Sequence, residues 1–181
     1  MKPINEMSQA ELAAFIQSHL ESKNIKVALS GGAVVAFYSK NQYVSKDLDL
    51  VNMYSAKRAI IRDAMAGIGF IELDRHFHHP DSEFFVEFPP GPLSLGSEHA
   101  GKLNQIHLTT GVLHLLNPTD CVKDRLAAYY HWGDRQCLAQ AILVSKAHMI
   151  DIKEVERWSV VEGKGDEFHQ IKDKLQGKDK K

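Results

Sequence analysis

The 181-residue sequence predicts an α+β fold in which a mixed β-sheet flanked by helices precedes a helical C-terminal segment. Short apolar runs bounded by turn residues recur through the first two-thirds of the chain, with two or three helical patterns among them. After Asn117-Pro118 the apolar spacing becomes helical throughout. We therefore expect an α/β core over residues 1–117, a helical segment over 118–175 that packs on it, and a disordered tail over 176–181.

The first element is a helix with a clear start signal. Ser8 can cap it, and Glu11, three residues later, can complete a capping box. Apolar residues then recur at helical spacing until Asn24 ends the pattern. The next apolar run, over residues 26–29, is typical of a short buried strand.

The other elements follow in order along the chain. In the core we expect a short helix over 33–38, a strand over 47–51, a helix over 59–65 capped by Ser55, strands over 70–73 and 84–88, and a hairpin that joins 105–108 to 112–116. The histidine-rich stretch between 73 and 84 is expected to be a loop, and the prolines after 88 should end that strand. In the helical segment we expect helices over 121–132 with Thr119 as the cap, 134–144, 151–161 and 166–175.

Two aspartates in the second strand carry the clearest chemical signal. Successive strand side chains point to opposite faces, so Asp47 and Asp49 share one face while Leu48 and Leu50 point to the core. Carboxylates about 7 Å apart along a strand repel each other unless a cation lies between them. Such hard oxygen ligands suit Mg²⁺, which commonly takes one or two carboxylates and completes its shell with substrate phosphate oxygens.

The glycine pair that precedes these aspartates suits phosphate binding. Gly31 and Gly32 lie where a strand passes into a helix, so a triphosphate could approach the backbone amides at the helix start. Ser30 adds a hydroxyl that could bind a phosphate oxygen. Alone, a glycine pair is more often a plain turn, and an isolated Asp-x-Asp is more often a solvated strand. Their joint occurrence in this order favours a functional site.

The segment Leu29-Ser30-Gly31-Gly32, followed after fourteen residues by Lys46-Asp47-Leu48-Asp49-Leu50-Val51, resembles the nucleotidyltransferase superfamily that shares the DNA polymerase β-like core. The match covers about residues 25–90, with a spacer slightly longer than usual. The family adds a third carboxylate on a later strand. Glu87, the lone acid in an apolar strand, is the candidate, although the family more commonly has aspartate. Some small bacterial members are toxins of toxin–antitoxin or phage-defence systems.

The resemblance implies a Mg²⁺-dependent enzyme that moves a nucleoside monophosphate from an NTP to an acceptor hydroxyl. Asp47, Asp49 and Glu87 would be the catalytic residues and would bind one or two Mg²⁺ ions, with Glu87 alternatively acting as the general base. The acceptor could be RNA, such as a tRNA, a protein hydroxyl, or a small molecule such as an aminoglycoside. A toxin-type enzyme would also have an antitoxin partner.

The same resemblance assigns the nucleotide-binding residues. Ser30, Gly31 and Gly32 would hold the β- and γ-phosphates. Lys123 could reach the phosphates or the acceptor, although a solvated helix lysine is the alternative interpretation. A second hypothesis for the whole protein is a catalytically inactive nucleotide-sensing or partner-binding module of the same fold, and a third is a purely structural α/β protein.

Composition limits the partners. Twenty-two basic and twenty-three acidic side chains leave no basic surplus, so any RNA contact would have to be local. No stretch approaches the length of an apolar membrane span, and Cys121 and Cys137 are expected to be free thiols. We therefore expect a cytoplasmic protein without membrane contact. His76 and His78 invite a zinc interpretation, but the loop interpretation is favoured.

Overall fold

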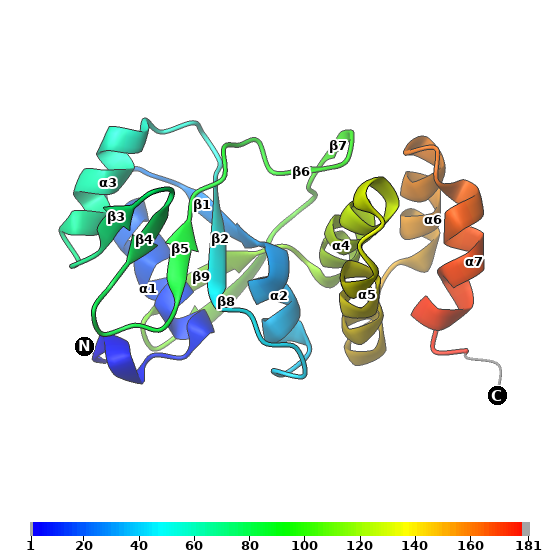
Figure 1. Ribbon diagram of the computed structural model, residues 1–181, viewed down its shortest axis with the longest axis horizontal. Helices are drawn as coiled ribbons and strands as arrows, with labels where there is room; N and C mark the ends of the chain where they lie inside the picture. The colour runs from blue at the N-terminus through cyan, green and yellow to red at the C-terminus, as the bar shows by residue number, and fades with distance from the viewer. Residues whose placement is uncertain (1, 179–181) are drawn as a thin grey trace.

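The computed structural model describes residues 2–178 and confirms the mixed α/β fold (Figure 1). Within this range seven strands form one mixed sheet in the order β3-β4-β5-β2-β1-β9-β8, and two short strands form a separate ribbon. The strands are β1 (Val27–Ser30), β2 (Asp47–Asn52), β3 (Ile71–Leu73), β4 (His76–His78), β5 (Phe85–Glu87), β6 (Ser94–Leu95), β7 (Glu98–His99), β8 (Asn104–Leu108) and β9 (Gly111–Leu115).

The helices begin where local capping chemistry predicts in most cases. They are α1 (Gln9–Glu21), α2 (Gly31–Tyr38), α3 (Arg58–Ala66), α4 (Pro118–Trp132), α5 (Arg135–Ala147), α6 (Ile152–Val161) and α7 (Gly165–Leu175), preceded by one 3₁₀ turn (Ile4–Glu6). The capping box of Ser8 and Glu11 is present in full at the start of α1. Asp134 and Asp151 cap α5 and α6 by accepting hydrogen bonds from backbone amides of the first turn.

Two caps differ from expectation. Ser55 does not cap α3, which begins after Lys57 without any side-chain cap, because Ser55 is held in a left-handed turn before the helix. Asn117 rather than Thr119 caps α4, because Pro118 occupies the first helical position and starts the helix three residues earlier than expected.

The order of the strands sets the position of the aspartates. β2 pairs antiparallel with β1 on one side and parallel with β5 on the other. Leu48, Leu50 and Val86 are fully buried in the core on one face of this central region. The alternate residues of the same strands therefore lie on the opposite face, which carries the candidate chemistry.

Two parts of the sheet region were not expected. The histidine-rich stretch contains a real strand, β4, which pairs with β3 and β5. The segment between the prolines and the last hairpin forms the β6–β7 ribbon, which reaches the helical segment. Trp158 of α6 is fully buried and donates a hydrogen bond to the Leu95 carbonyl at 2.8 Å, which anchors this ribbon.

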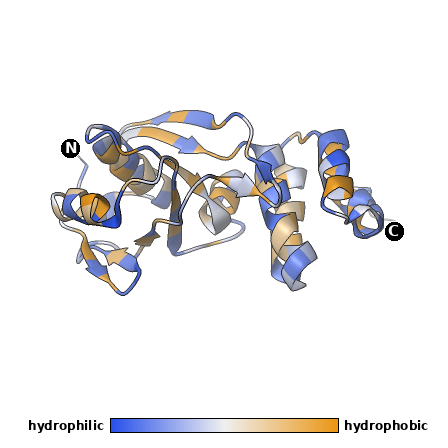
Figure 2. Cartoon of the chain, turned by 90° about the horizontal axis from the view of Figure 1, so that it is seen from above, coloured by the Kyte–Doolittle hydropathy of each residue, from blue (hydrophilic) through white to orange (hydrophobic). Residues whose placement is uncertain are grey.

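The helical segment extends from one end of the sheet. Helices α4 and α5 pack against each other and against α2, and α6 and α7 lie beyond them (Figures 1 and 2). The expected tail over 176–181 lies partly outside the described residues, because 179–181 are not described. Cys121 and Cys137 are both free and buried. None of the helices between residues 2 and 178 has the length and apolar character needed to span a membrane.

Candidate active site

Three of the side chains that the sequence predicted for the site lie in one row across the sheet. The pairing of β1 with β2 sets Ser30 opposite Asp49, and the pairing of β2 with β5 sets Asp49 opposite Glu87. Directly paired residues point to the same face, and Asp47 shares that face because it is two residues from Asp49. Asp47, Asp49 and Glu87 therefore line one face, with Ser30 at the edge nearest α2.

Gly31 is required by its contact with Asp49. Its φ is +71°, a left-handed conformation that favours glycine. A Cβ added at Gly31 would overlap the Oδ2 atom of Asp49. The missing side chain thus lets the helix start come directly against the carboxylate of the neighbouring strand. Gly32 is also confined, because an added Cβ would lie 3.2 Å from a ring carbon of Tyr43 and 3.3 Å from the Ser45 hydroxyl.

The start of α2 leaves backbone donors beside the carboxylates. Ser30 is the N-cap residue of this eight-residue helix, but its side chain makes no capping hydrogen bond. The first-turn amides, which begin at Gly31, have no partner within the helix. Such amides favour an anion, and the short side chains around them leave the backbone accessible. This end of α2 can therefore bind a phosphate next to Asp49.

The carboxylates oppose one another electrostatically. Burial of Asp49, and then the charges of Asp47 and Glu87, raise the pKa of Asp49 to about 6. When the pKa of a carboxyl group is raised in this way, its ionisation costs free energy in the folded protein. A bound cation would remove that cost. The donor set is made of carboxylate oxygens, which are the ligands that Mg²⁺ prefers. These residues therefore fit a divalent cation.

Glu87 is turned to its other neighbours in this structure. Its Oε1 lies 3.7 Å from Nε of Arg75, and its Oε2 lies 3.6 Å from Nε2 of His76. Among residues 2–178, no three His, Cys, Asp or Glu side chains are gathered closely enough to hold a metal ion as they stand. The backbone thus brings Glu87 to the correct face beside Asp49, while its carboxylate pairs with Arg75 and His76.

Lys123 does not lie at this site. Its side chain is 6% exposed, and its Nζ lies 2.6 Å from Glu154 Oε1 and 3.6 Å from Asp120 Oδ1. The contact with Glu154 holds α4 against α6, and both partners of the ammonium belong to the helical segment. The nucleotide-binding prediction for Lys123 is therefore not supported, and the solvated-lysine alternative is wrong because the side chain is buried.

Arg125, two residues after Lys123 on α4, is the basic residue of this helix whose charge acts on the site. Its charge acts on Asp49 and on Tyr43, and it lowers the pKa of both groups against the larger effect of burial. The guanidinium is held by Asp124 at 2.5 Å and by the Gln140 side chain at 3.4 Å. Arg125 and Tyr43 are thus candidate site residues to which the sequence interpretation gave no role. The confinement of Gly32 by Tyr43 is visible only in the fold.

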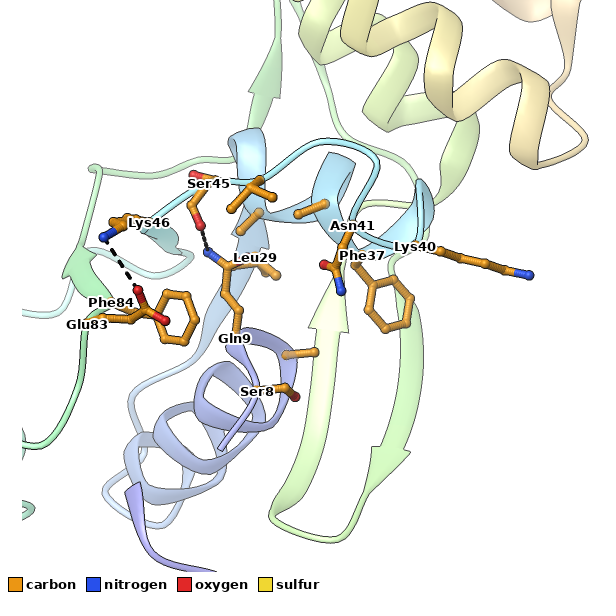
Figure 3. Close-up of a pocket in the computed structure, with 14 residues that line it drawn as sticks. Ser8, Gln9, Leu29, Phe37, Lys40, Asn41, Ser45, Lys46, Glu83 and Phe84 are labelled. Carbon is orange, nitrogen blue, oxygen red and sulfur yellow. Dashed lines mark hydrogen bonds and ion pairs between the residues drawn. The ribbon is translucent and has the colours of Figure 1, made fainter. Parts of the chain in front are cut away.

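A cavity of about 450 Å³ lies close by but on the other face (Figure 3). Ser8 and Gln9 at the start of α1, Phe37 of α2 and the loop that contains Lys40 line it. Leu29 also lines it, and Leu29 points to the opposite face of β1 from Ser30. The cavity therefore does not belong to the carboxylate site.

Comparison with known proteins places this geometry in a known fold. No family model matches the sequence, and no curated protein matches it either. A nucleotidyltransferase-like antigenic protein from Paracoccidioides brasiliensis has a similar structure, with a TM-score of 0.61, 14% identity, and coverage of 93% of this chain and 92% of that one.

The antibiotic-resistance factor ANT(2'')-Ia is also similar in structure. Its solution structure gives a TM-score of 0.52 with 13% identity over 90% of this chain and 92% of that chain. Its crystal structure with adenylyl-2''-tobramycin gives 0.54 with 13% identity over 82% and 92%. At these identities the likeness concerns the fold, and it agrees with the resemblance found in the sequence. The chain has the nucleotidyltransferase fold.

Proposed function

We propose that this protein is a divalent-metal-dependent nucleotidyltransferase that moves a nucleoside monophosphate from an NTP to an acceptor hydroxyl. The observation that supports it best is the row of Ser30, Asp49 and Glu87 across three paired strands, with Asp47 on the same face. A purely structural sheet would gain nothing from three carboxylates on one face, where burial and then the charges of Asp47 and Glu87 raise the pKa of Asp49.

Asp47 and Asp49, with Glu87, would hold the metal, and the cation would neutralise the triphosphate and lower the pKa of the attacking hydroxyl. Hydrogen-bond donors of the chain suit the outer phosphates of the substrate. The amides at Gly31 and Gly32 and the Ser30 hydroxyl would bind the outer phosphates. Arg125 would add a cation on the side of the helical segment.

The bond changes are those of an in-line displacement. The acceptor oxygen bonds to the α-phosphorus, the bond from that phosphorus to the bridging oxygen breaks, and pyrophosphate leaves. The hydroxyl proton must pass to a base. Glu87 of β5, at the end of the row away from Ser30, is the candidate for this base.

One observation favours the alternative of an inactive nucleotide-sensing or partner-binding module. Glu87 pairs with Arg75 and His76 rather than joining the two aspartates. In that case the protein would bind an NTP through Asp47, Asp49 and the start of α2, but it would not turn over. Binding without transfer would identify this alternative.

The test uses the full chain with each α-labelled NTP, Mg²⁺ and a cell extract. Transfer of label to a macromolecule or small molecule is expected, together with an NTP- and Mg²⁺-dependent thermal shift. Asp49→Asn should abolish transfer, and Asp63→Asn on α3, remote from the row, is the matched control. If the wild type transfers no label from any NTP and Asp49→Asn behaves like the wild type, the enzymatic proposal fails.

The sequence resemblance also suggests a toxin-type enzyme with an antitoxin partner. Expression of the wild-type chain should then arrest bacterial growth, and Asp49→Asn should not. Equal growth with both would remove the toxin proposal while leaving nucleotidyl transfer untouched.

A further inference from the structure

The cavity of about 450 Å³ has no role in the proposed function, and it lies on the other face of the sheet from the carboxylates (Figure 3). Small-molecule sites in proteins commonly have volumes of about 300–1,000 Å³. Ala33 and Ala36 lie one turn apart on α2 and line the cavity, where larger side chains would fill it. Leu29 of β1 adds a buried apolar wall. The apolar part of the cavity is therefore built by the same helix whose start borders Asp49.

Two aromatic rings and an amide complete the cavity next to this apolar wall. Phe37 of α2 and Phe84, which precedes β5, are half-buried and line it. Figure 3 shows the Asn41 amide beside the Phe37 ring. Among residues 2–178 the side-chain amide of Asn41 has no hydrogen-bond partner, so it is available to a ligand. An apolar space with a few hydrogen-bonding groups at its edge is typical of sites for small organic molecules.

The charged side chains that line the cavity sum to +1, because Lys40 and Lys46 are balanced by one acid, Glu83. The Nζ of Lys46 lies 3.4 Å from Oε2 of Glu83, but both side chains are more than half exposed, so water screens this pair. The ammonium of Lys40 has no partner within the part of the chain that the structure describes, and in Figure 3 its side chain extends from the rim. Nearby acids are engaged elsewhere, since Glu11 has its own ion pair and Asp81 lines a separate cavity. The rim therefore favours an anion, toward which the flexible stem of Lys40 can turn.

One loop connects this cavity to the carboxylate site. Residues 39–46 join α2 to β2, and most of them line the cavity. Tyr43 of this loop instead lies against the start of α2, where a Cβ added at Gly32 would be 3.2 Å from its ring. Ser45 lines the cavity, and its hydroxyl accepts a hydrogen bond from the Asp47 amide at 3.2 Å. A ligand that fixes the loop from the cavity side therefore also fixes Tyr43 and the first residue of β2.

We propose that the cavity binds a small amphipathic anion, an aromatic or medium-chain aliphatic carboxylate, and that its occupation tightens NTP binding at the carboxylate row. The apolar body lies against the two alanines of α2 and the phenylalanine rings, and the carboxylate meets the Asn41 amide and the lysines of the rim. A neutral apolar molecule would leave the lysines unused, and a free phosphate would leave the apolar wall uncovered. The binding part is independent of the proposed nucleotidyl transfer, whereas the coupling part rests on it.

The direction of the coupling follows from the position of the loop over residues 39–46. In this structure the loop lines a formed cavity, while the start of α2 at Gly31 lies directly against Asp49. A ligand that binds this arrangement better than any other shifts the population toward it. The arrangement is also the one that suits the triphosphate, and coupling between two sites is reciprocal. We therefore expect each ligand to tighten the binding of the other.

The binding test titrates 2-naphthylacetate and octanoate into the full ¹⁵N-labelled chain and follows the amide chemical shifts. Ala36→Leu and Ala10→Leu fill the cavity from α2 and from α1, and the half-buried Ala10 covers the case in which Ala36→Leu does not fold. Asn41→Asp adds a repelling charge with a residue that tolerates the φ of +63°. Each variant is expected to bind the carboxylates about tenfold more weakly. Ala59→Leu on α3 and Asn24→Asp, exposed and with a φ of +60°, are the matched controls and should bind like the wild type.

The neutral amides of both probes test the charge of the ligand. They are expected to bind the wild type about threefold or more weakly than the carboxylates, because they lack a charge-assisted contact with the lysines. Equal affinity for acids and amides would overturn the anionic class. Absence of binding by both carboxylates, or equal binding by the filled variants and the wild type, would overturn the cavity as a site.

The coupling test measures the Kd of the wild type for Mg²⁺–NTP with and without saturating 2-naphthylacetate. The Kd is expected to fall by about threefold or more when the probe is present. Ala10→Leu should have the Kd of the probe-free wild type under both conditions, because its cavity is filled while its carboxylate site is intact. An unchanged or higher Kd in the wild type would overturn the coupling and leave the cavity site standing. If the wild type binds no NTP, the proposed function and the coupling both fail, and the naphthylacetate titration alone decides the cavity site.

Discussion

The Oδ2 atom of Asp49 occupies the space where Gly31 would carry a side chain. The start of one helix and a carboxylate of the next strand therefore touch without any intervening atom. This contact joins the two halves of the sequence signature, which are fifteen residues or more apart along the chain, into one site.

Gly31→Ala should be both destabilising and inactive. The substitution forces an alanine to a φ of +71° and drives its Cβ into the Asp49 carboxylate. Strain in this backbone region costs about 1–3 kcal/mol, and the clash adds to it. We expect a lower unfolding free energy in urea and a transfer rate reduced by more than tenfold.

Gly133→Ala separates the effect of backbone strain from the effect of the clash with Asp49. Gly133 has a φ of +68°, but an added Cβ there would meet nothing within 4 Å. This control should lose about 1 kcal/mol and keep its activity. If both variants were equally stable and equally active, the contact between Gly31 and Asp49 would have no functional importance.

Asp49→Asn should stabilise the metal-free protein in a pH-dependent way. Burial, with the charges of Asp47 and Glu87, raises the pKa of Asp49 from 3.8 to about 6. The folded state thus binds this proton more tightly than the unfolded chain does. The ionised carboxylate costs stability above about pH 6, and the cost disappears as the pH falls toward 3.8.

Urea unfolding in chelator at pH 8 should therefore show a gain of about 1–3 kcal/mol for Asp49→Asn over the wild type. At pH 4 most of the gain should be gone. Asp63→Asn is the control, because Asp63 is exposed on α3, remote from the row, and should show little change. A gain that stayed constant from pH 4 to pH 8 would contradict the assignment. Mg²⁺ should stabilise the wild type more than Asp49→Asn.

Lys123→Met should affect folding rather than nucleotide binding. The ammonium is buried between Glu154 and Asp120, and its removal leaves Asp120, which is 5% exposed, without that cation. We expect a loss of about 2 kcal/mol in unfolding free energy, reduced from the fully buried case because Glu154 is partly exposed. The KM for NTP should not change. Lys153→Met, an exposed lysine of α6, is the control, and a raised KM in Lys123→Met alone would restore a role at the site.

Much of the carboxylate row could be predicted from the sequence because it rests on local rules. Alternation along a strand puts Asp47 and Asp49 on one face, and a lone acid in an apolar strand marks Glu87. The pairing of β2 with β5 is not local, and the sequence resemblance implied only that a third carboxylate lies on a later strand. The structure then shows that the register is direct.

The contacts of Glu87 could not be predicted in the same way. His76 lies on a three-residue strand in a polar, histidine-rich stretch, which resembles a loop by composition. Its strand character comes from pairing with β3 and β5 rather than from propensity.

The choice between Lys123 and Arg125 depends on the rotation of one helix. Two residues apart on α4, they point about 200° apart around the axis. From the sequence alone, Lys123 and Arg125 are each a basic side chain on the same helix. Packing against α6 turns Lys123 inward to Glu154, whereas the Arg125 guanidinium lies against Asp124 and Gln140, and its charge lowers the pKa of Asp49 against the larger effect of burial.

Arg125→Gln should weaken NTP binding without removing the metal-binding carboxylates. Its cation is the one that acts on Asp49 from the helical segment, and loss of a charge-assisted phosphate contact typically costs about 1.5–3 kcal/mol. We expect the Mg²⁺–NTP affinity, measured by thermal-shift titration, to fall by tenfold or more. Asp124→Asn removes the ion-pair partner and keeps the cation, so it should bind NTP as tightly as the wild type or more tightly. Equal affinity in Arg125→Gln and the wild type would mean that the guanidinium only joins α4 to α5 through Gln140, and that the triphosphate is held from the α2 side alone.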